Sequence, residues 1–293
     1  MTKFRRVAVV GVGLIGGSFA LALRQRGFSG EIVGWDHAEV LGRAESRGAI
    51  HRGSTELAQA LEGADLVYIA TPVVLTIELL PQILRNVPFG ALVTDTGSSK
   101  RAICRVAQEA RPAGVLFLGG HPIAGKEACG IENADPDLFV GAPYVLTPDP
   151  PEVFETEAAS ALLEWIREIG AQPTSLDPET HDWALALVSH LPQLLSTALA
   201  SAVWDETDED GLPIRIAGAG FRSMTRLAAS PYEIWRDIGL TNADNIGRAL
   251  ERLGQKLERI RTALTARELE EEFRKAQEIH ERLEALRSER RRS

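Results

Sequence analysis

The sequence predicts an α/β protein in which a Rossmann-type domain, with a doubly wound parallel sheet, precedes an all-α domain. Three observations indicate this class. An apolar run breaks into spaced glycines near the N-terminus, apolar strands then alternate with helical segments, and only helical patterns follow. Such alternation is typical of a parallel sheet covered on both faces, with ligands outside the carboxyl ends of its strands. We expect the first domain at residues 1–177 and the helical domain at residues 178–293.

The first strand and its turn predict a dinucleotide site. Residues 7–10 have a buried-strand pattern, and spaced glycines follow it before the apolar residues 19–23. Spaced glycines fit a tight turn onto a helix, whose free N–H groups and positive dipole end bind a pyrophosphate. Glycine-rich turns also close ordinary strand–helix units, so the pattern needs support from its context. The cofactor-binding residues predicted in this turn are Gly11, Gly13, Leu14, Ile15 and Gly16.

A carboxylate after the second strand supplies that context. Residues 31–35 form another apolar run, and Asp36 follows 25 positions after Gly11. This is close to the spacing of roughly 20 residues at which an acid binds the adenosine ribose diol. Because an acid at this place repels a 2′-phosphate, we expect NAD rather than NADP as the cofactor. The alternative is that Asp36 only caps its strand.

The remaining strands of the first domain also end at polar residues. We expect helices at about 37–48, 54–61, 73–84 and 155–169, and strands at 65–70, 91–94, 115–118, 143–146 and 173–176. Pro72 after Thr71 stops one strand and restarts the chain as a helix, and both residues are further cofactor-binding candidates. Polar residues at these strand ends are the first candidates for chemistry.

A strongly apolar segment opens the helical half. Residues 182–204 carry His190, Pro192 and Gln193 near their middle. Polar residues and a proline at these places favour a buried, kinked helix over a membrane span, and no other segment is predicted to cross a membrane.

The end of the chain predicts a helical hairpin. Apolar residues recur at steps of four and three between Ile246 and Leu264, which is the stripe of a helix that packs along a partner. Thr265 with Glu268 forms a capping box that starts a last helix. A small helical domain with this much apolar seam favours a homodimer.

Composition excludes several classes of partner. The chain has 293 residues, of which 44% are hydrophobic and 25% charged, with a formal net charge of −9. This charge argues against nucleic acid and anionic membranes, so an anionic substrate needs a local cluster of cations. Two cysteines, Cys104 and Cys129, give neither a disulfide framework nor a metal-ligand spacing, and no export signal is evident. We therefore expect a cytoplasmic protein without a metal site.

Six histidines compete for the role of proton carrier, which this side chain fills best near neutral pH. His121 follows an apolar strand and two glycines, where cofactor chemistry is expected. His190 lies on the apolar helix, where it is either a hydrogen-bonded histidine of the core or a residue that contacts the substrate. The other four have polar neighbours and are predicted to lie at the surface: His37, His51, His181 and His280.

Five motifs together resemble one enzyme family. They are the glycine turn at 11–18, Asp-Thr-Gly-Ser-Ser-Lys at 95–100, Gly-Gly-His-Pro-Ile-Ala-Gly at 119–125, Ser-His-Leu-Pro at 189–192, and the segment 220–237 from Gly-Phe-Arg to Trp-Arg-Asp. In this order they resemble the prephenate and arogenate dehydrogenases of tyrosine biosynthesis, over nearly the whole chain. The resemblance implies NAD-dependent oxidative decarboxylation, of prephenate to 4-hydroxyphenylpyruvate or of arogenate to tyrosine.

The resemblance also implies roles for two residues near the nicotinamide. His121 matches the family histidine that accepts the proton of the ring hydroxyl as hydride leaves the same carbon. Ser98 matches the serine that hydrogen-bonds this histidine and the cofactor, which fixes tautomer and distance. The alternative for His121 is a structural histidine at a strand end.

The substrate of this family is an anion that an acidic protein must hold with cations. Arg226 matches the family arginine that grips the ring carboxylate with two parallel hydrogen bonds, and the alternative is a surface salt bridge. Lys100 is a further positive candidate, although it and Lys126 could be ordinary surface lysines. The other substrate-binding residues that the resemblance implies are His190, Gln193, Glu127, Lys126 and Trp235.

Two positions depart from the family pattern. Gln193 stands where several members have a second histidine, and Lys126 stands where a small hydroxyl residue is common. A keto acid and an amino acid would differ at these positions, so prephenate and arogenate both stay open. Two other classes also stay open: a β-hydroxyacid or imine reductase, and a non-catalytic NAD-responsive binding protein in which His121 is structural.

Overall fold

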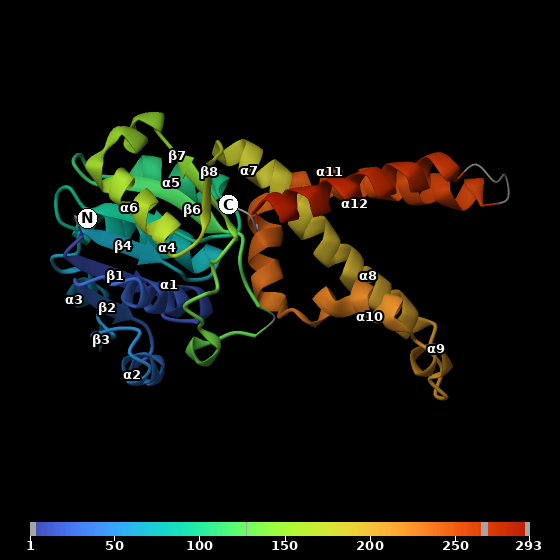
Figure 1. Cartoon of the computed structure of the whole chain (residues 1–293), viewed down its shortest axis with the longest axis horizontal. Helices are drawn as coiled ribbons and strands as arrows, with labels where there is room; N and C mark the ends of the chain where they lie inside the picture. The colour runs from blue at the N-terminus through green and yellow to red at the C-terminus, as the bar shows by residue number, and fades with distance from the viewer. Residues whose placement is uncertain (1–3, 127, 265–268, 291–293) are drawn as a thin grey trace. The chain divides into compact units, whose positions relative to one another are not determined.

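The computed structural model describes residues 4–126, 128–264 and 269–290. Its strands are β1 (Arg6–Val10), β2 (Glu31–Trp35), β3 (Arg52–Ser54), β4 (Leu66–Ile69), β5 (Leu92–Asp95), β6 (Leu116–Pro122), β7 (Pro143–Pro148) and β8 (Gln172–Ser175). They form one sheet in the order β3-β2-β1-β4-β5-β6-β7-β8, with helices on both faces (Figure 1). The strand order reverses direction at the β1/β4 junction, so the predicted doubly wound fold is confirmed.

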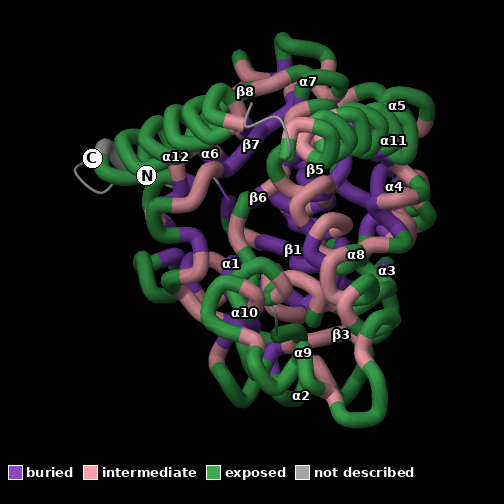
Figure 2. The backbone as a smooth tube through the Cα atoms, turned by 90° about the vertical axis from the view of Figure 1, so that its right-hand side faces the viewer, coloured by how far each residue is buried: buried purple, intermediate pink, exposed green. Residues whose placement is uncertain are grey.

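Helices cover both faces of this sheet. They are α1 (Leu14–Gln25), α2 (Ala38–Ser46), α3 (Leu57–Leu61), α4 (Val73–Asn86), α5 (Arg101–Ala110) and α6 (Glu157–Glu168), with 3-10 turns η1 (Ile131–Asn133) and η2 (Pro151–Glu155). Val9 of β1 belongs to the same core as Phe19 of α1, whereas Val10 belongs to the core that includes Leu80 of α4. Successive side chains of a strand point to opposite faces, so one strand serves both cores. The buried strands are visible in purple in Figure 2.

The carboxyl ends of six strands meet at one edge of the sheet. Neighbouring strands pair in parallel except β6 and β7, which are antiparallel. Gly11, Asp36 and Thr71 therefore follow their strands at the same edge as His121, which lies near the end of β6. This is the edge at which doubly wound folds bind ligands.

Local structure differs from the prediction at three places. Arg52–Ser54 forms the edge strand β3, and the helix expected from residue 54 starts at Leu57. Arg101–Ala110 is a helix that the sequence reading left out. Strand β6 continues through His121 to Pro122, because its last residues pair with β7.

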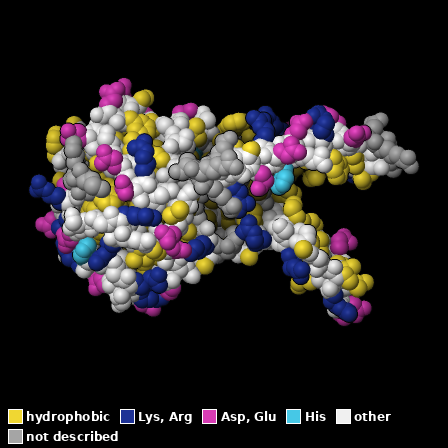
Figure 3. Space-filling view, in the orientation of Figure 1, with side chains coloured by type: hydrophobic (Ala, Val, Ile, Leu, Met, Phe, Trp, Pro, Cys, Tyr) yellow, Lys and Arg dark blue, Asp and Glu magenta, His cyan; other side chains and the backbone are white. Residues whose placement is uncertain are grey.

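The apolar segment after β8 is helical throughout, and a π-helical turn interrupts it where a kink was predicted. It consists of α7 (Pro178–Leu185), a π-helical turn η3 (Ala186–His190) and α8 (Leu191–Asp205). A π turn is a common cause of a helix kink. The prediction that this segment is buried is wrong in part, because Trp183, Val188 and Trp204 are more than half exposed. Hydrophobic side chains lie open at the surface along α8 (Figure 3).

By length and composition alone, this segment passes a test for membrane-spanning helices. Pro178–Asp205 has 28 residues with a mean hydropathy of 1.3, and 22% of its apolar window is buried. A single such helix is a weak indication of a membrane, since helices of other kinds meet the same criterion.

The chain divides into two compact units, residues 1–243 and 244–293. Within the first unit, α8 is followed by α9 (Leu212–Arg215), α10 (Ala219–Thr225) and the 3-10 turn η4 (Arg226–Ala229). Helix α11 (Tyr232–Ala263) carries a non-helical residue at Asn242, next to the division between the units. The domain boundary after residue 177 stays a prediction.

The second unit contains the end of α11 and all of α12 (Glu270–Arg290). Lys256 of the first helix donates to Glu272 of the second at 2.8 Å. Leu257, Phe273 and Leu283 are more than half exposed in a single chain. The predicted capping box of Thr265 and Glu268 lies outside the described residues.

Candidate active site

At two positions of the glycine turn between β1 and α1, a backbone carbonyl lies too close to admit a side chain. Gly11 has φ of +90°, and a Cβ there would lie 2.7 Å from the carbonyl oxygen of Ala70. A Cβ at Gly16 would lie 2.0 Å from the carbonyl oxygen of Gly11. At Gly13, in contrast, a Cβ would meet no atom within 4 Å. Gly11 and Gly16 are therefore required by the turn itself, whereas Gly13 leaves open space beside the backbone.

The N-terminus of α1 suits a bound phosphate group. No side chain caps this helix, and its first turn contains no acidic residue. Asp36 lies next to it, because one carboxylate oxygen accepts a hydrogen bond from the Val12 amide at 2.8 Å. The turn thus combines free N–H groups with a carboxylate at the end of β2, which fits the phosphates and the ribose diol of a dinucleotide.

A buried ion pair fixes the loop that follows β5. The Lys100 ammonium contacts the Asp95 carboxylate and also donates to the carbonyl of Gly120 at 2.7 Å. Asp95 accepts further hydrogen bonds from the Gly97 amide at 2.8 Å and the Gly120 amide at 3.2 Å. These bonds tie the loop carrying Ser98 to the strand end that carries His121. Lys100 is fully buried, so it is neither a surface lysine nor a free cation for substrate.

His121 is hydrogen-bonded to a second histidine. Its Nδ1 lies 2.9 Å from Nε2 of His181, and Nδ1 of His181 lies 2.7 Å from the Asp182 carboxylate. Burial is the largest cause that holds the pKa of His121 well below its usual value, and the nearby His181, Lys100 and His190 lower it further. His121 is therefore neutral at pH 7, as a general base must be.

Three buried side chains on one stretch of helix have polar atoms without a hydrogen-bond partner among the described residues. They are Nε2 of His190, Oε1 of Gln193 and the hydroxyl of Ser196, spaced three residues apart. Burial lowers the pKa of His190 to about 4, so this ring is neutral as well. The Trp235 ring lies 6.1 Å from the His190 ring. Buried polar atoms normally have a partner, so this row offers three polar atoms that a bound polar ligand or an ordered water would satisfy.

Two family models together match most of the chain. The model described as "Prephenate dehydrogenase, nucleotide-binding domain" matches residues 19–174. The model described as "Prephenate dehydrogenase, dimerization domain" matches residues 177–278. The chain belongs to the prephenate dehydrogenase family.

Individual proteins of similar sequence and structure belong to the same family. The chain is 33% identical to a prephenate dehydrogenase of Lactococcus lactis, over 94% of this chain and 78% of that protein. The structure of prephenate dehydrogenase from A. aeolicus in complex with hydroxyphenyl propionate and NAD+ matches with a TM-score of 0.86 and 30% identity, covering 97% and 99% of the two chains. Synechocystis arogenate dehydrogenase matches with a TM-score of 0.78 and 31% identity, covering 96% and 99%.

The predicted site residues of this dehydrogenase differ in their exposure and in their contacts. Arg226 is exposed at the start of η4, and Ser98 is half-buried in the loop after β5. The Lys126 ammonium pairs with Asp135 at 2.8 Å. Glu127 lies outside the described residues. The substrate-binding and catalytic roles of these residues stay predictions.

The remaining cofactor candidates lie at strand ends. Leu14 and Ile15 open α1, directly after the glycine turn. The Thr71 hydroxyl lies 2.8 Å from the Thr76 hydroxyl, and Pro72 precedes the first residue of α4. Among the residues that the structure describes, no group of His, Cys, Asp and Glu side chains is arranged to hold a metal ion.

The sequence did not predict the roles of His181, which is the direct partner of His121, or of Asp182, which bonds to His181. His181 was predicted to lie at the surface, and that prediction is wrong, because both side chains are fully buried. Their polar neighbours suggested exposure, but α7 packs against α5 and β7 and buries both side chains. A usable signal was that two adjacent titratable residues stand at the start of a strongly apolar segment, a few residues after the last strand.

Proposed function

We propose that this chain catalyses the NAD-dependent oxidative decarboxylation of prephenate, of arogenate, or of both. One observation carries the proposal: a neutral histidine, His121, lies at the sheet edge where the glycine turn and Asp36 form a dinucleotide site. Family membership supports this reaction class over a β-hydroxyacid or imine reductase. The match to relatives named as dehydrogenases supports an enzyme over a non-catalytic binding protein.

NAD fits the residues that would hold it. The open space at Gly13 and the uncapped start of α1 suit the pyrophosphate, and Asp36 suits the ribose diol while repelling a 2′-phosphate. Leu14, Ile15, Thr71 and Pro72 complete the proposed cofactor site. When bound, NAD would accept the hydride that leaves the substrate.

The protein's own task in this reaction is to move one proton and to hold one anion. His121 accepts the proton of the ring hydroxyl, and its neutral form makes it competent for this at pH 7. Ser98, whose loop is tied to the end of β6, is the proposed hydrogen-bonding residue that would orient His121 and the bound cofactor. Carbon dioxide then leaves as the ring becomes aromatic, which itself drives the step.

Arg226 is the proposed anchor of the ring carboxylate, because its planar guanidinium offers two parallel donors. The buried row that includes His190 and Gln193, with Trp235 beside it, would receive the side chain of the substrate. Gln193 is uncharged and can donate and accept, so it suits a keto acid or an amino acid. Glu127 and Lys126 are the remaining proposed residues of this pocket. To bind the substrate, Lys126 would have to give up its ion pair with Asp135.

The direct test is an assay with purified protein, NAD or NADP, and prephenate or arogenate in parallel, following nicotinamide reduction. We expect reduction with NAD and at least one of the two substrates. In His121→Asn, kcat should fall by about 100-fold or more while NAD still binds, because a general base contributes roughly that much. His280→Asn, at an exposed position of α12, is the matched control and should leave kcat unchanged. Absence of reduction with both substrates would contradict the proposal.

We further propose a homodimer formed through the helical domain, residues 178–293, with residues 1–177 as the nucleotide-binding domain. The match of residues 177–278 to a dimerization domain supports it, as do the exposed apolar side chains in that range. A second copy of the chain would then cover the apolar surface along α8, and no membrane or nucleic-acid partner is proposed. The cytoplasm stays the predicted compartment.

A further inference from the structure

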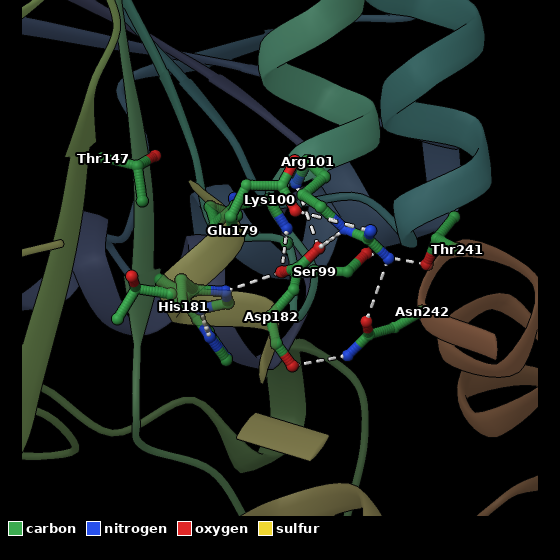
Figure 4. A network of polar contacts seen from close by, with 12 residues as sticks. Ser99, Lys100, Arg101, Thr147, Glu179, His181, Asp182, Thr241 and Asn242 are labelled. Carbon is green, nitrogen blue, oxygen red and sulfur yellow. Dashed lines mark hydrogen bonds and ion pairs between the residues drawn. The ribbon is translucent and has the colours of Figure 1, made fainter. Parts of the chain in front are cut away.

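Three buried or half-buried side chains form a continuous line of hydrogen bonds. Asp182 bonds to Nδ1 of His181, and Nε2 of His181 bonds to Nδ1 of His121. Both His181 and Asp182 have no exposed surface. Figure 4 shows His181 and Asp182 close to Lys100 and Arg101 at the start of α5.

The aspartate at the end of this line is firmly held. Its carboxylate accepts hydrogen bonds from the backbone amides of Lys100 at 2.7 Å and Arg101 at 3.1 Å. It thereby caps α5, a helix that has no side-chain cap of its own. Burial raises the pKa of Asp182, but the hydrogen bond from His181 and these two amide bonds outweigh it and hold the pKa below its usual value, so Asp182 is ionised.

An ionised carboxylate determines where the protons of both histidines lie. A carboxylate can only accept, so Nδ1 of His181 must carry the proton in that contact. Burial lowers the pKa of His181, although its bond to Asp182 opposes this, so the ring is neutral and its Nε2 has a lone pair. Nδ1 of His121 must therefore donate to it. Neutral His121 is then left with its lone pair on Nε2, which is the atom able to accept a proton.

We propose that His181 is a positioning residue that, held by Asp182, keeps His121 in the tautomer whose Nε2 accepts the substrate's proton. The inference rests on the proposed function, because it explains how the base of that reaction is prepared. The same arrangement stabilises the positive charge that forms on His121 when it accepts the proton. Protonated His121 still donates to His181, and His181 in turn donates to the Asp182 carboxylate. The same logic of nucleophile or base, partner and third orienting group recurs in other active sites.

The test compares Asp182→Asn and His181→Phe with Glu179→Gln. Glu179 lies on the same helix, is largely exposed and pairs with Arg101 at 3.4 Å, so its amide variant is a matched control. An asparagine amide can donate to Nδ1 of His181, which would reverse both tautomers. Nitrogen-15 NMR of the histidine rings, at a pH above 7 and without substrate, reads the tautomer of His121 directly.

We expect His121 to be protonated at Nδ1 in the wild type and in Glu179→Gln, and at Nε2 in Asp182→Asn. In Asp182→Asn and His181→Phe, kcat should fall by about 100-fold or more, while KM and NAD affinity change by less than about threefold. An unchanged tautomer in Asp182→Asn would overturn the inference, as would an unchanged kcat in both variants. The NMR measurement needs no substrate, so it tests the tautomer of His121 independently of the activity assay. A wild type that reduces NAD with neither substrate would overturn the proposed function and would leave the tautomer result standing.

Discussion

Arg226 is the residue on which the binding of an anionic substrate to an acidic protein depends. In Arg226→Ala, we expect KM for prephenate or arogenate to rise by about 10- to 100-fold, since hydrogen bonds to charged groups contribute roughly 1.5–3 kcal/mol. The affinity for NAD should stay the same. Steady-state kinetics and NAD titration of this variant and of Arg215→Ala, an exposed arginine of α9, measure both. A loss of NAD affinity instead would contradict the assignment of Arg226 to the substrate.

The protonation of His121 predicts the acid side of the pH profile. A base works only when it is unprotonated, so activity is lost as pH falls through its pKa. Burial, with His181, Lys100 and His190 nearby, holds this pKa well below 6.5. We therefore expect kcat/KM to stay level as pH falls from 7 past 6.5 and to decline only below that. An acid limb with its midpoint at or above pH 6.5 would contradict this.

At the scale of elements, two glycines of the turn are expected to serve different purposes: Gly16 is needed for folding, and Gly13 is needed for cofactor binding. Gly16→Ala places a Cβ against the backbone of Gly11, so it should destabilise the protein by about 1–3 kcal/mol. Gly13→Ala meets open space, and its φ of −81° lies outside the left-handed region that favours glycine, so its Tm should fall less than that of Gly16→Ala. Its NAD affinity should nevertheless fall, because the added methyl group occupies the approach of the pyrophosphate. Thermal unfolding and NAD titration distinguish the two; unchanged NAD binding in Gly13→Ala would remove the turn from the cofactor site.

The elements also show what a sequence can and cannot predict. Strands such as β1 and β4 are continuous apolar runs, which reveal themselves because both faces are buried. Strand β3 has the sequence Arg-Gly-Ser at the edge of the sheet, so no apolar pattern marks it. The position of His121 at a strand end was predictable from local order. The burial of His181 and Lys100 was not, because it depends on which distant elements pack against them.

At the scale of the molecule, the apolar surface of the helical half predicts association. We expect the protein to sediment at twice the mass of one chain at micromolar concentration. Leu257→Glu, which charges an exposed position of the apolar stripe, should shift the equilibrium toward monomer, since burying a leucine contributes about 1.5–3 kcal/mol. Glu258→Gln, at the next position, is the control. Sedimentation of the wild type as a monomer at these concentrations would contradict the proposed dimer.

The proposed reaction requires one pocket in which His121 of the sheet edge and Arg226 of the helical region reach the same substrate. A crystal structure with NADH and whichever of prephenate and arogenate the enzyme oxidises tests this most directly, because the reduced cofactor cannot accept hydride and the complex does not react. We predict the ring hydroxyl at about 2.6–3.2 Å from Nε2 of His121 and the ring carboxylate on the Arg226 guanidinium. That substrate bound away from His121, or with its ring carboxylate on other residues, would contradict the proposed mechanism.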